Sequence, residues 1–278
     1  MFTFWLACSL VLLNWGIEAR KWQLLLHPLE KLNFTTAFKS TLAGCSITML
    51  TPNRVGEYGG RILYVSQKNR IDAIPLTILG SISQLFVTVI MGAAGLIYFK
   101  IKNKHLQFFT FLPNYSYNIF LVISISIAIV LLMLYLRIGN LVKYLDKINF
   151  LKKFVVHIYL LNTFSRKQLL RILILSFFRY VVFILQFILL LYSLKVGIPF
   201  VTCFALLTLF YLIMAVAPTI GFMELPIRAA ASLQLLQLYS NNIVGIQVAA
   251  LGIWVLNLVI PAILGSLLIL NIKILKEK

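Results

Sequence analysis

Long apolar runs separated by short polar segments dominate the chain. Five of these runs reach the roughly 20 residues that a helix needs to cross the hydrocarbon core of a bilayer. Their apolar residues are consecutive and do not alternate with polar ones, a pattern typical of helices and not of a membrane β-barrel. We therefore expect an all-α fold, a polytopic integral membrane helix bundle. The predicted spans are Phe4–Leu26, Asp72–Phe99, Tyr117–Leu136, Leu169–Leu194 and Ile243–Leu270.

Two further apolar segments are interrupted. Phe34–Leu50 and Phe200–Ala217 each run into a break that contains Pro and Gly, and shorter, more polar helices follow at Gly59–Gln67 and Met223–Tyr239. Proline ends the entering helix and glycine permits a tight turn, so the chain can reverse its direction inside the membrane. We predict a re-entrant-like helix pair at each break.

The composition is that of a chain embedded in lipid. Of the 278 residues, 61% are hydrophobic and 12% are charged, and the mean hydropathy is +0.97. A soluble domain usually has about a quarter of its residues charged. We predict a single transmembrane domain over residues 1–278. The three cysteines lie far apart in apolar stretches without the spacing of metal ligands, and no cofactor or metal is expected.

The net charge of +18 reflects 25 Lys and Arg residues against 7 acids. The cations gather in the short segments between apolar runs, which is the pattern of the positive-inside rule. We favour this topological interpretation over nucleic-acid binding, because no basic face interleaved with aromatic residues accompanies the charge. The 137–171 segment and the C-terminus are predicted to be cytoplasmic. Their cations are Arg137, Lys143, Lys147, Lys152, Lys153, Arg166, Lys167, Arg171, Lys273, Lys276 and Lys278.

An even number of crossings must lie between two cytoplasmic segments. This holds if the last two spans each cross once and the broken pair between them returns to its own side. The same count along the whole chain predicts two inverted-topology repeats, at about 4–99 and 169–271. A linking span and the basic loop, at about 100–168, join them. One loop departs from the charge rule, because this topology places on the outside Lys100, Lys102 and Lys104.

The two breaks share one order of residues: Pro, then Gly, then Glu, then an Arg four residues after the Glu. The same separation along the chain joins Glu57 to Glu224 and Arg61 to Arg228, and one extra residue aligns the prolines. With only seven acids in the chain, chance is a poor explanation for this match. The predicted hairpin-break residues are Pro52, Gly56, Gly59, Gly60, Pro218 and Gly221.

Glu and Arg at positions i and i+4 lie on one helix face, within reach of an ion pair. A charge near mid-bilayer costs about 2.5–3.5 kcal/mol on the insertion scale, so it is usually paired or functional. In one interpretation each pair only neutralises itself and pins its hairpin. In the other, arginines near helix N-termini bind a phosphate-type headgroup, and the glutamates orient them or contact a cationic headgroup or a proton. The candidate headgroup residues are Arg54, Glu57, Arg61, Glu224, Arg228 and Arg179.

Other polar residues lie within the predicted spans. Arg171 and Arg179 are eight residues apart and share a helix face, with Arg179 inside the headgroup boundary. Snorkelling of Arg179 to lipid phosphates is the simpler interpretation, and a place in the headgroup site is the alternative. Gln84, Gln186 and Asn257 are predicted to form hydrogen bonds between helices.

The first break and the span before it resemble a known family. The stretch Pro-Asn-Arg-Val-Gly-Glu-Tyr-Gly-Gly-Arg from Pro52 to Arg61, with Asn14-Trp15 to Trp22 before it, is similar to the transmembrane region of the lysylphosphatidylglycerol synthetase/flippase family. The second break, with Pro261 and Gly265, matches more loosely. The resemblance implies movement of aminoacylated or other phospholipids between leaflets, without the separate aminoacyl-transfer domain. Family members commonly have one more span at the start and a basic residue near the position of Trp254.

Together these features predict a lipid transporter or flippase-like protein of the bacterial cytoplasmic (inner) membrane. Its partners would be membrane lipids, anionic or aminoacylated phospholipids, bound at a midplane site. No enzyme activity is expected, since Asp72 and Asp146 are the only aspartates and no Ser/His/Asp set can be placed. The alternatives are a membrane enzyme acting on a lipid-linked substrate and a non-catalytic membrane subunit. The lipid species, the energy source and assembly as a homo-oligomer or with a partner membrane protein stay open.

Overall fold

The computed structural model describes residues 2–51, 55–102, 114–138, 157–217 and 223–276. These residues form helices and turns, with no strand among them. The long helices are α1 (Phe2–Leu26), α4 (Arg70–Ile101), α5 (Asn114–Leu136) and α8 (Arg166–Ser193). The all-α prediction is confirmed for the described part of the chain.

The last predicted span is built from three consecutive helical segments. They are α11 (Ile243–Trp254), a π-helical turn (Val255–Val259) and α12 (Ile260–Lys276). With it, five helices of the described chain are long and apolar enough to cross a membrane. They match the five predicted spans to within a few residues at most ends. The chain is an integral membrane protein.

The interrupted segments form pairs of shorter helices. These are α2 (Phe34–Thr48) with α3 (Gly56–Ile62), and α9 (Phe200–Val216) with α10 (Glu224–Leu236); single 3-10 turns occur at Gln67–Asn69 and Tyr159–Thr163. The first short helix begins three residues before its predicted start. The Thr51 hydroxyl accepts a hydrogen bond from the Gly56 amide at 2.7 Å, which satisfies a backbone donor at this helix start.

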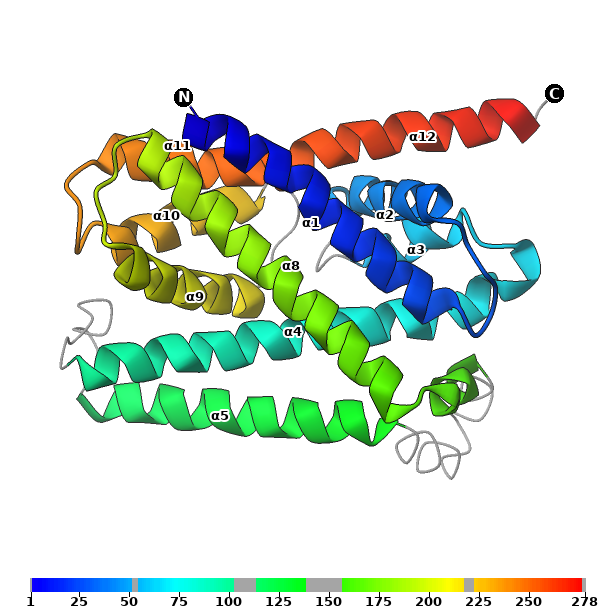
Figure 1. The fold of residues 1–278 in the computed structure, drawn as a ribbon, viewed down its shortest axis with the longest axis horizontal. Coiled ribbons are helices and arrows are strands. Elements are labelled where there is room, and N and C mark those ends of the chain that lie inside the picture. Colours follow the sequence, from blue (N-terminus) through cyan, green and yellow to red (C-terminus); the bar gives the residue numbers. More distant parts are fainter. Residues whose placement is uncertain (1, 52–54, 103–113, 139–156, 218–222, 277–278) are drawn as a thin grey trace.

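The elements are arranged around two antiparallel contacts (Figure 1). α1 and α8 cross the molecule side by side in opposite directions, and α4 and α5 form a second antiparallel pair. α2 and α3 lie beside the C-terminal half of α1, whereas α9 and α10 lie near the C-terminal half of α4. α12 packs on α2. The middle of the bundle is therefore reached by residues from both halves of the chain.

Small residues allow two of these packings. A Cβ atom on Gly60 of α3 would lie 2.4 Å from the Ala43 carbonyl oxygen of α2, and one on Gly95 of α4 would lie 2.1 Å from Oγ1 of Thr208 in α9. In lipid the hydrophobic effect does not drive helices together, so they usually associate through close backbone approach at small residues. Glycine at these positions thus decides how the broken pairs seat against their neighbours.

Burial separates lipid-facing from central helices. In the most apolar 18-residue stretch of α8, half of the residues are buried inside the protein. In the corresponding stretch of α5 only 17% are buried. α5 also exposes many large apolar side chains, among them Ile119, Val122 and Met133. In a bilayer such a surface contacts lipid tails at no cost. α8 can therefore carry side chains into the centre of the bundle.

Candidate functional site

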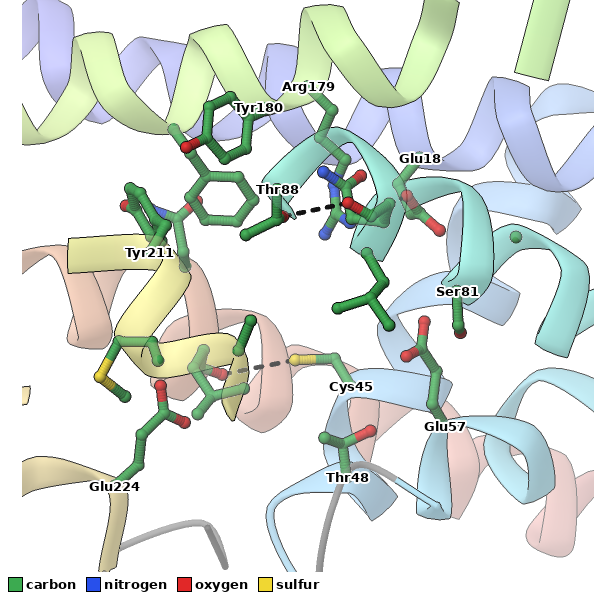
Figure 2. A pocket seen from close by; sticks show the side chains of 18 of the residues that line it. Glu18, Cys45, Thr48, Glu57, Ser81, Thr88, Arg179, Tyr180, Tyr211 and Glu224 are labelled. Carbon is green, nitrogen blue, oxygen red and sulfur yellow. Dashed lines mark hydrogen bonds and ion pairs between the residues drawn. The ribbon is translucent and has the colours of Figure 1, made fainter. Parts of the chain in front are cut away.

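A cavity of about 520 Å³ lies between the broken helix pairs and the central spans. Side chains of α1, α2, α3, α4, α8, α9, α10, α11 and the π-helical turn line it (Figure 2). Its wall is unusually charged for the interior of a membrane protein, where ionisable residues are rare and costly. The charged lining residues are Glu18, Lys21, Glu57, Arg61, Arg179, Glu224 and Arg228.

Glu18 of α1 is the centre of the charge network. Its carboxylate forms ion pairs with Lys21 Nζ at 2.8 Å, Arg61 Nη2 at 2.6 Å and Arg179 Nη1 at 3.0 Å. The Glu18 side chain is only 3% exposed. Three cations from α1, α3 and α8 thus meet at one buried carboxylate, which ties the three helices together. Removing Glu18 would leave additional uncompensated positive charge in a low dielectric.

The Glu/Arg pairs predicted at spacing i, i+4 both form. Arg61 is paired with Glu57 as well as with Glu18, and Arg228 is paired with Glu224. Both pairs line the same cavity, although they come from opposite halves of the sequence. In Figure 2 Glu57 and Glu224 reach into it from different sides. The structure therefore brings together five of the six predicted headgroup residues, with Arg179 as the fifth.

Aromatic rings hold the three arginines in place. The Arg61 guanidinium lies 5.4 Å from the Trp22 ring centroid, and that of Arg228 lies 5.4 Å from the Phe210 centroid. Arg179 lies 5.2 Å from the Phe183 centroid. A cation over an aromatic face contributes about 2 kcal/mol when it is desolvated. The guanidinium groups are therefore preorganised, which lowers the entropy cost of binding an anion.

A chain of amides orients Arg179. Its Nε donates to Asn14 Oδ1 at 3.1 Å, and Asn14 Nδ2 donates to Asn257 Oδ1 at 2.7 Å. Asn257 lies in the π-helical turn, and its own amide donates to the Ile253 carbonyl at 3.3 Å. π-helical turns often occur at functional sites. Arg179 points into the cavity in Figure 2, so the snorkelling interpretation is wrong for this residue.

The other polar residues of the spans form the predicted contacts between helices. Gln84 donates to the Ser176 carbonyl at 3.3 Å, and Gln186 donates to the Ala7 carbonyl at 3.1 Å. With the contact of Asn257 to Asn14, all three interhelical hydrogen bonds predicted from the sequence are confirmed. Gln84 and Asn257 also line the cavity, whereas Gln186 does not.

Some of the predicted residues lie outside the described part of the chain or outside the charged network. Arg54 and the hairpin-break residues Pro52, Pro218 and Gly221 lie outside the described residues. The remaining break residues all belong to α3, where Gly56 and Gly60 are buried and Gly59 is exposed. Within the described chain, no group of three or more His, Cys, Asp or Glu residues could hold a metal ion.

The sequence prediction missed the α1 side of the cavity. Asn14, Glu18 and Lys21 are all buried there, and they form the network described above. The spacing of these residues, i, i+4 and i+7, places them on one face of an otherwise apolar helix. A search for polar positions with helical spacing inside a predicted span would have found them.

Comparison with known proteins supports a family assignment. The sequence matches the family described as the lysylphosphatidylglycerol synthase TM region over residues 1–265. No curated protein and no solved structure matches the chain. The matched residues include every element that lines the cavity, from α1 to the π-helical turn. The chain therefore belongs to the lysylphosphatidylglycerol synthase transmembrane-region family.

Proposed function

We propose that the chain is a lipid transporter of the flippase type, and that the cavity binds the headgroup of an anionic or aminoacylated phospholipid. The observation that carries the proposal is the meeting of three arginines and one lysine at a cavity inside an otherwise apolar bundle. Cations fixed at membrane depth are rare, and they usually mark a substrate or ion path. Lipid phosphates lie at both surfaces of the bilayer, so they are the anions that such a cavity meets when it opens to either leaflet.

The family supports a lipid as the cargo, because its description names the membrane region of a lysylphosphatidylglycerol synthase. In the proposed mechanism, the two broken helix pairs belong to inverted repeats, one opening toward the cytoplasm and the other toward the exterior. Alternate opening of the two pairs exposes the cavity first to one leaflet and then to the other. The headgroup crosses through the charged cavity while the acyl chains stay in the lipid. No covalent chemistry on the lipid is part of this proposal.

The cellular setting is proposed from the charge pattern. Positive segments face the cytoplasm, so we place the C-terminus and the 137–171 loop on that side of the bacterial cytoplasmic membrane. Most of that loop, residues 139–156, lies outside the described residues. Cysteine substitutions at Lys167 and in the loop at 100–104, labelled with a membrane-impermeant maleimide in intact cells, test the orientation. Labelling at 100–104 and protection at Lys167 are expected, and the reverse contradicts the topology.

Reconstituted proteoliposomes test the transport proposal. Fluorescent phospholipid is placed in both leaflets, and a membrane-impermeant reductant reports the fraction that reaches the outer leaflet. The wild-type protein is expected to make the inner-leaflet pool accessible, whereas Arg61→Ala and Arg228→Ala lose this activity. Arg20→Ala is the matched control, since Arg20 is exposed and does not line the cavity. It removes one positive charge and should leave translocation unchanged.

The same assay separates the alternatives. Lipid recovered chemically modified supports an enzyme acting on a lipid-linked substrate. If the lipid is neither translocated nor modified, the result supports a non-catalytic subunit. If Arg61→Ala and Arg228→Ala lower the yield of folded protein in parallel with activity, the ion pairs serve to pin the hairpins and the headgroup role is contradicted. Mass spectrometry of lipid that co-purifies with the protein identifies the cargo.

A further inference from the structure

The charges of the cavity divide into two groups. Lys21, Arg61 and Arg179 are joined through Glu18, and Arg61 also contacts Glu57. This connected group of described residues, here called the Glu18 cluster, contains three cations and two carboxylates. One positive charge is therefore in excess. The Arg228–Glu224 pair balances itself.

The excess charge in the Glu18 cluster is buried. The side chains of Lys21 and Arg61 are each 2% exposed, and that of Arg179 is 12% exposed. A buried charge without a counter-charge is costly, because water cannot solvate it. One negative charge brought by a ligand brings the group to zero. Two negative charges overshoot and leave a buried excess of the opposite sign.

The cluster also has hydrogen-bond donors to offer. Arg61 Nε and the indole Nε1 of Trp15 are both buried and have no hydrogen-bond partner among the described residues. Both residues line the cavity. Buried donors without a partner are uncommon in native proteins, so a ligand atom that accepts a hydrogen bond from them would be stabilised here. An anionic oxygen entering the cavity would satisfy them and the excess charge together.

We infer that Glu18 sets the number of negative charges that the cavity accepts from a headgroup. Glu18 and Glu57 cancel two of the three cations, and the single positive charge that remains favours a phosphodiester headgroup of net charge −1 and disfavours a phosphomonoester or diphosphate. This rests on the proposed binding of a headgroup in the cavity. Glu18 suits the role better than Glu57, because its carboxylate contacts all three cations, whereas Glu57 is 23% exposed and, among the described residues, forms an ion pair with Arg61 alone. Glu18 is thus a specificity-determining residue.

Substitutions can set the charge of the cluster in unit steps. Lys21→Met brings it from +1 to zero, and Glu18→Gln brings it to +2 with little change of shape. Glu30→Gln is the matched control: it removes one acid of the chain, but Glu30 does not line the cavity and is bonded to Ser66 and Asn69. The net charge of the protein therefore changes equally in Glu18→Gln and Glu30→Gln, while the cavity charge changes only in the first.

Native mass spectrometry of the purified full chain measures the preference. The protein is mixed in detergent with equimolar phosphatidylglycerol, phosphatidic acid and phosphatidylcholine at pH 8. At this pH the phosphomonoester of phosphatidic acid carries more than one negative charge, since the second pKa of a phosphorylated side chain is about 6. Wild type and Glu30→Gln are expected to bind phosphatidylglycerol about tenfold better than phosphatidic acid. Glu18→Gln is expected to reverse this order by a similar factor. Lys21→Met is expected to lose the preference for phosphatidylglycerol over phosphatidylcholine.

Each outcome separates the inference from the proposal beneath it. Wild type that binds none of the three lipids overturns headgroup binding itself. Lipid binding with an equal preference for one and two charges in wild type, or with no reversal in Glu18→Gln, overturns only the role of Glu18. If Glu18→Gln does not fold, the wild-type ratio and Lys21→Met still decide the question. Release of bound lipid by inorganic phosphate alone at an equal concentration contradicts a lipid source for the anion.

Discussion

Arg61 and Glu18 lie 43 residues apart in the sequence, yet Arg61 Nη2 donates to Glu18 Oε1 at 2.6 Å in the interior of the bundle. The contact joins α3, from the first broken pair, to α1, a membrane span. Arg179 reaches the same carboxylate from α8. The Glu18 carboxylate therefore links α3 of the first broken pair to α1 and α8. A substitution of Glu18 removes contacts of all three helices.

The Glu18 cluster should be sensitive to unbalanced charge. We expect Glu18→Ala to lower the free energy of unfolding by about 3–5 kcal/mol, because it leaves three buried cations facing one remaining carboxylate. The double variant Glu18→Gln/Lys21→Met restores the original charge balance and should be more stable than Glu18→Gln alone. Thermal unfolding in detergent, followed by size-exclusion chromatography, measures both effects. Additive losses in the double variant would contradict charge balance as the cause.

The amide chain behind Arg179 makes a second prediction. Asn257→Ala removes the acceptor of the Asn14 amide, and we expect a loss of about 1–2 kcal/mol in stability together with reduced lipid translocation. Asn241→Ala is a suitable control, since Asn241 is exposed at the start of the last span. The same unfolding assay and the proteoliposome assay apply. Full translocation by a folded Asn257→Ala protein would show that Arg179 needs no support from this side.

Neighbouring glycines of α3 give a matched pair. A methyl group on Gly60 would lie 2.4 Å from the Ala43 carbonyl oxygen, so Gly60→Ala should separate α3 from α2 and sharply lower the yield of folded protein. A Cβ on Gly59 meets nothing within 4 Å, so Gly59→Ala should be neutral or stabilising by up to about 1 kcal/mol through helix propensity. Yield after size-exclusion chromatography compares the two. Equal tolerance of both substitutions would contradict the close packing of α2 and α3.

Glu30, in the segment between α1 and α2, predicts a dependence on pH. Partial burial acts to raise the pKa of its carboxyl, but hydrogen bonds from Ser66 and Asn69 outweigh burial and lower the pKa below its usual value. A carboxyl whose pKa is lowered in the folded state stabilises the protein above the unfolded pKa of about 4.3. That stabilisation is lost as the pH falls through the lower folded pKa.

The measurement compares wild type with Glu30→Gln between pH 7 and pH 3. Wild type should unfold at a higher temperature than the variant near pH 7, and the difference should shrink as the pH falls below about 4.3. Subtracting the variant removes the contributions of the other acids. A difference that stays constant over the whole range would show that the hydrogen bonds do not depend on the charge of Glu30.

Much of the architecture could be predicted from local sequence. The apolar runs determine the spans, because a helix in lipid must satisfy its own backbone and present apolar side chains over a fixed length. The Glu57–Arg61 and Glu224–Arg228 pairs follow from helical periodicity alone, since residues four apart share a face. The start of α3 was less predictable: it lies three residues before the predicted start, where the Thr51 hydroxyl accepts a hydrogen bond from the Gly56 amide.

By itself the sequence determined that this is a membrane protein of helices, with two broken pairs that each carry a Glu/Arg couple. Only the tertiary structure decided that both couples line one cavity and that Glu18 joins Lys21, Arg61 and Arg179 there. The reason is physical: periodicity places a side chain on a face of its own helix, but the partner of that face is chosen by packing between helices distant in sequence. Close approach at Gly60 and Gly95 is part of that packing, and hydropathy carries no record of it.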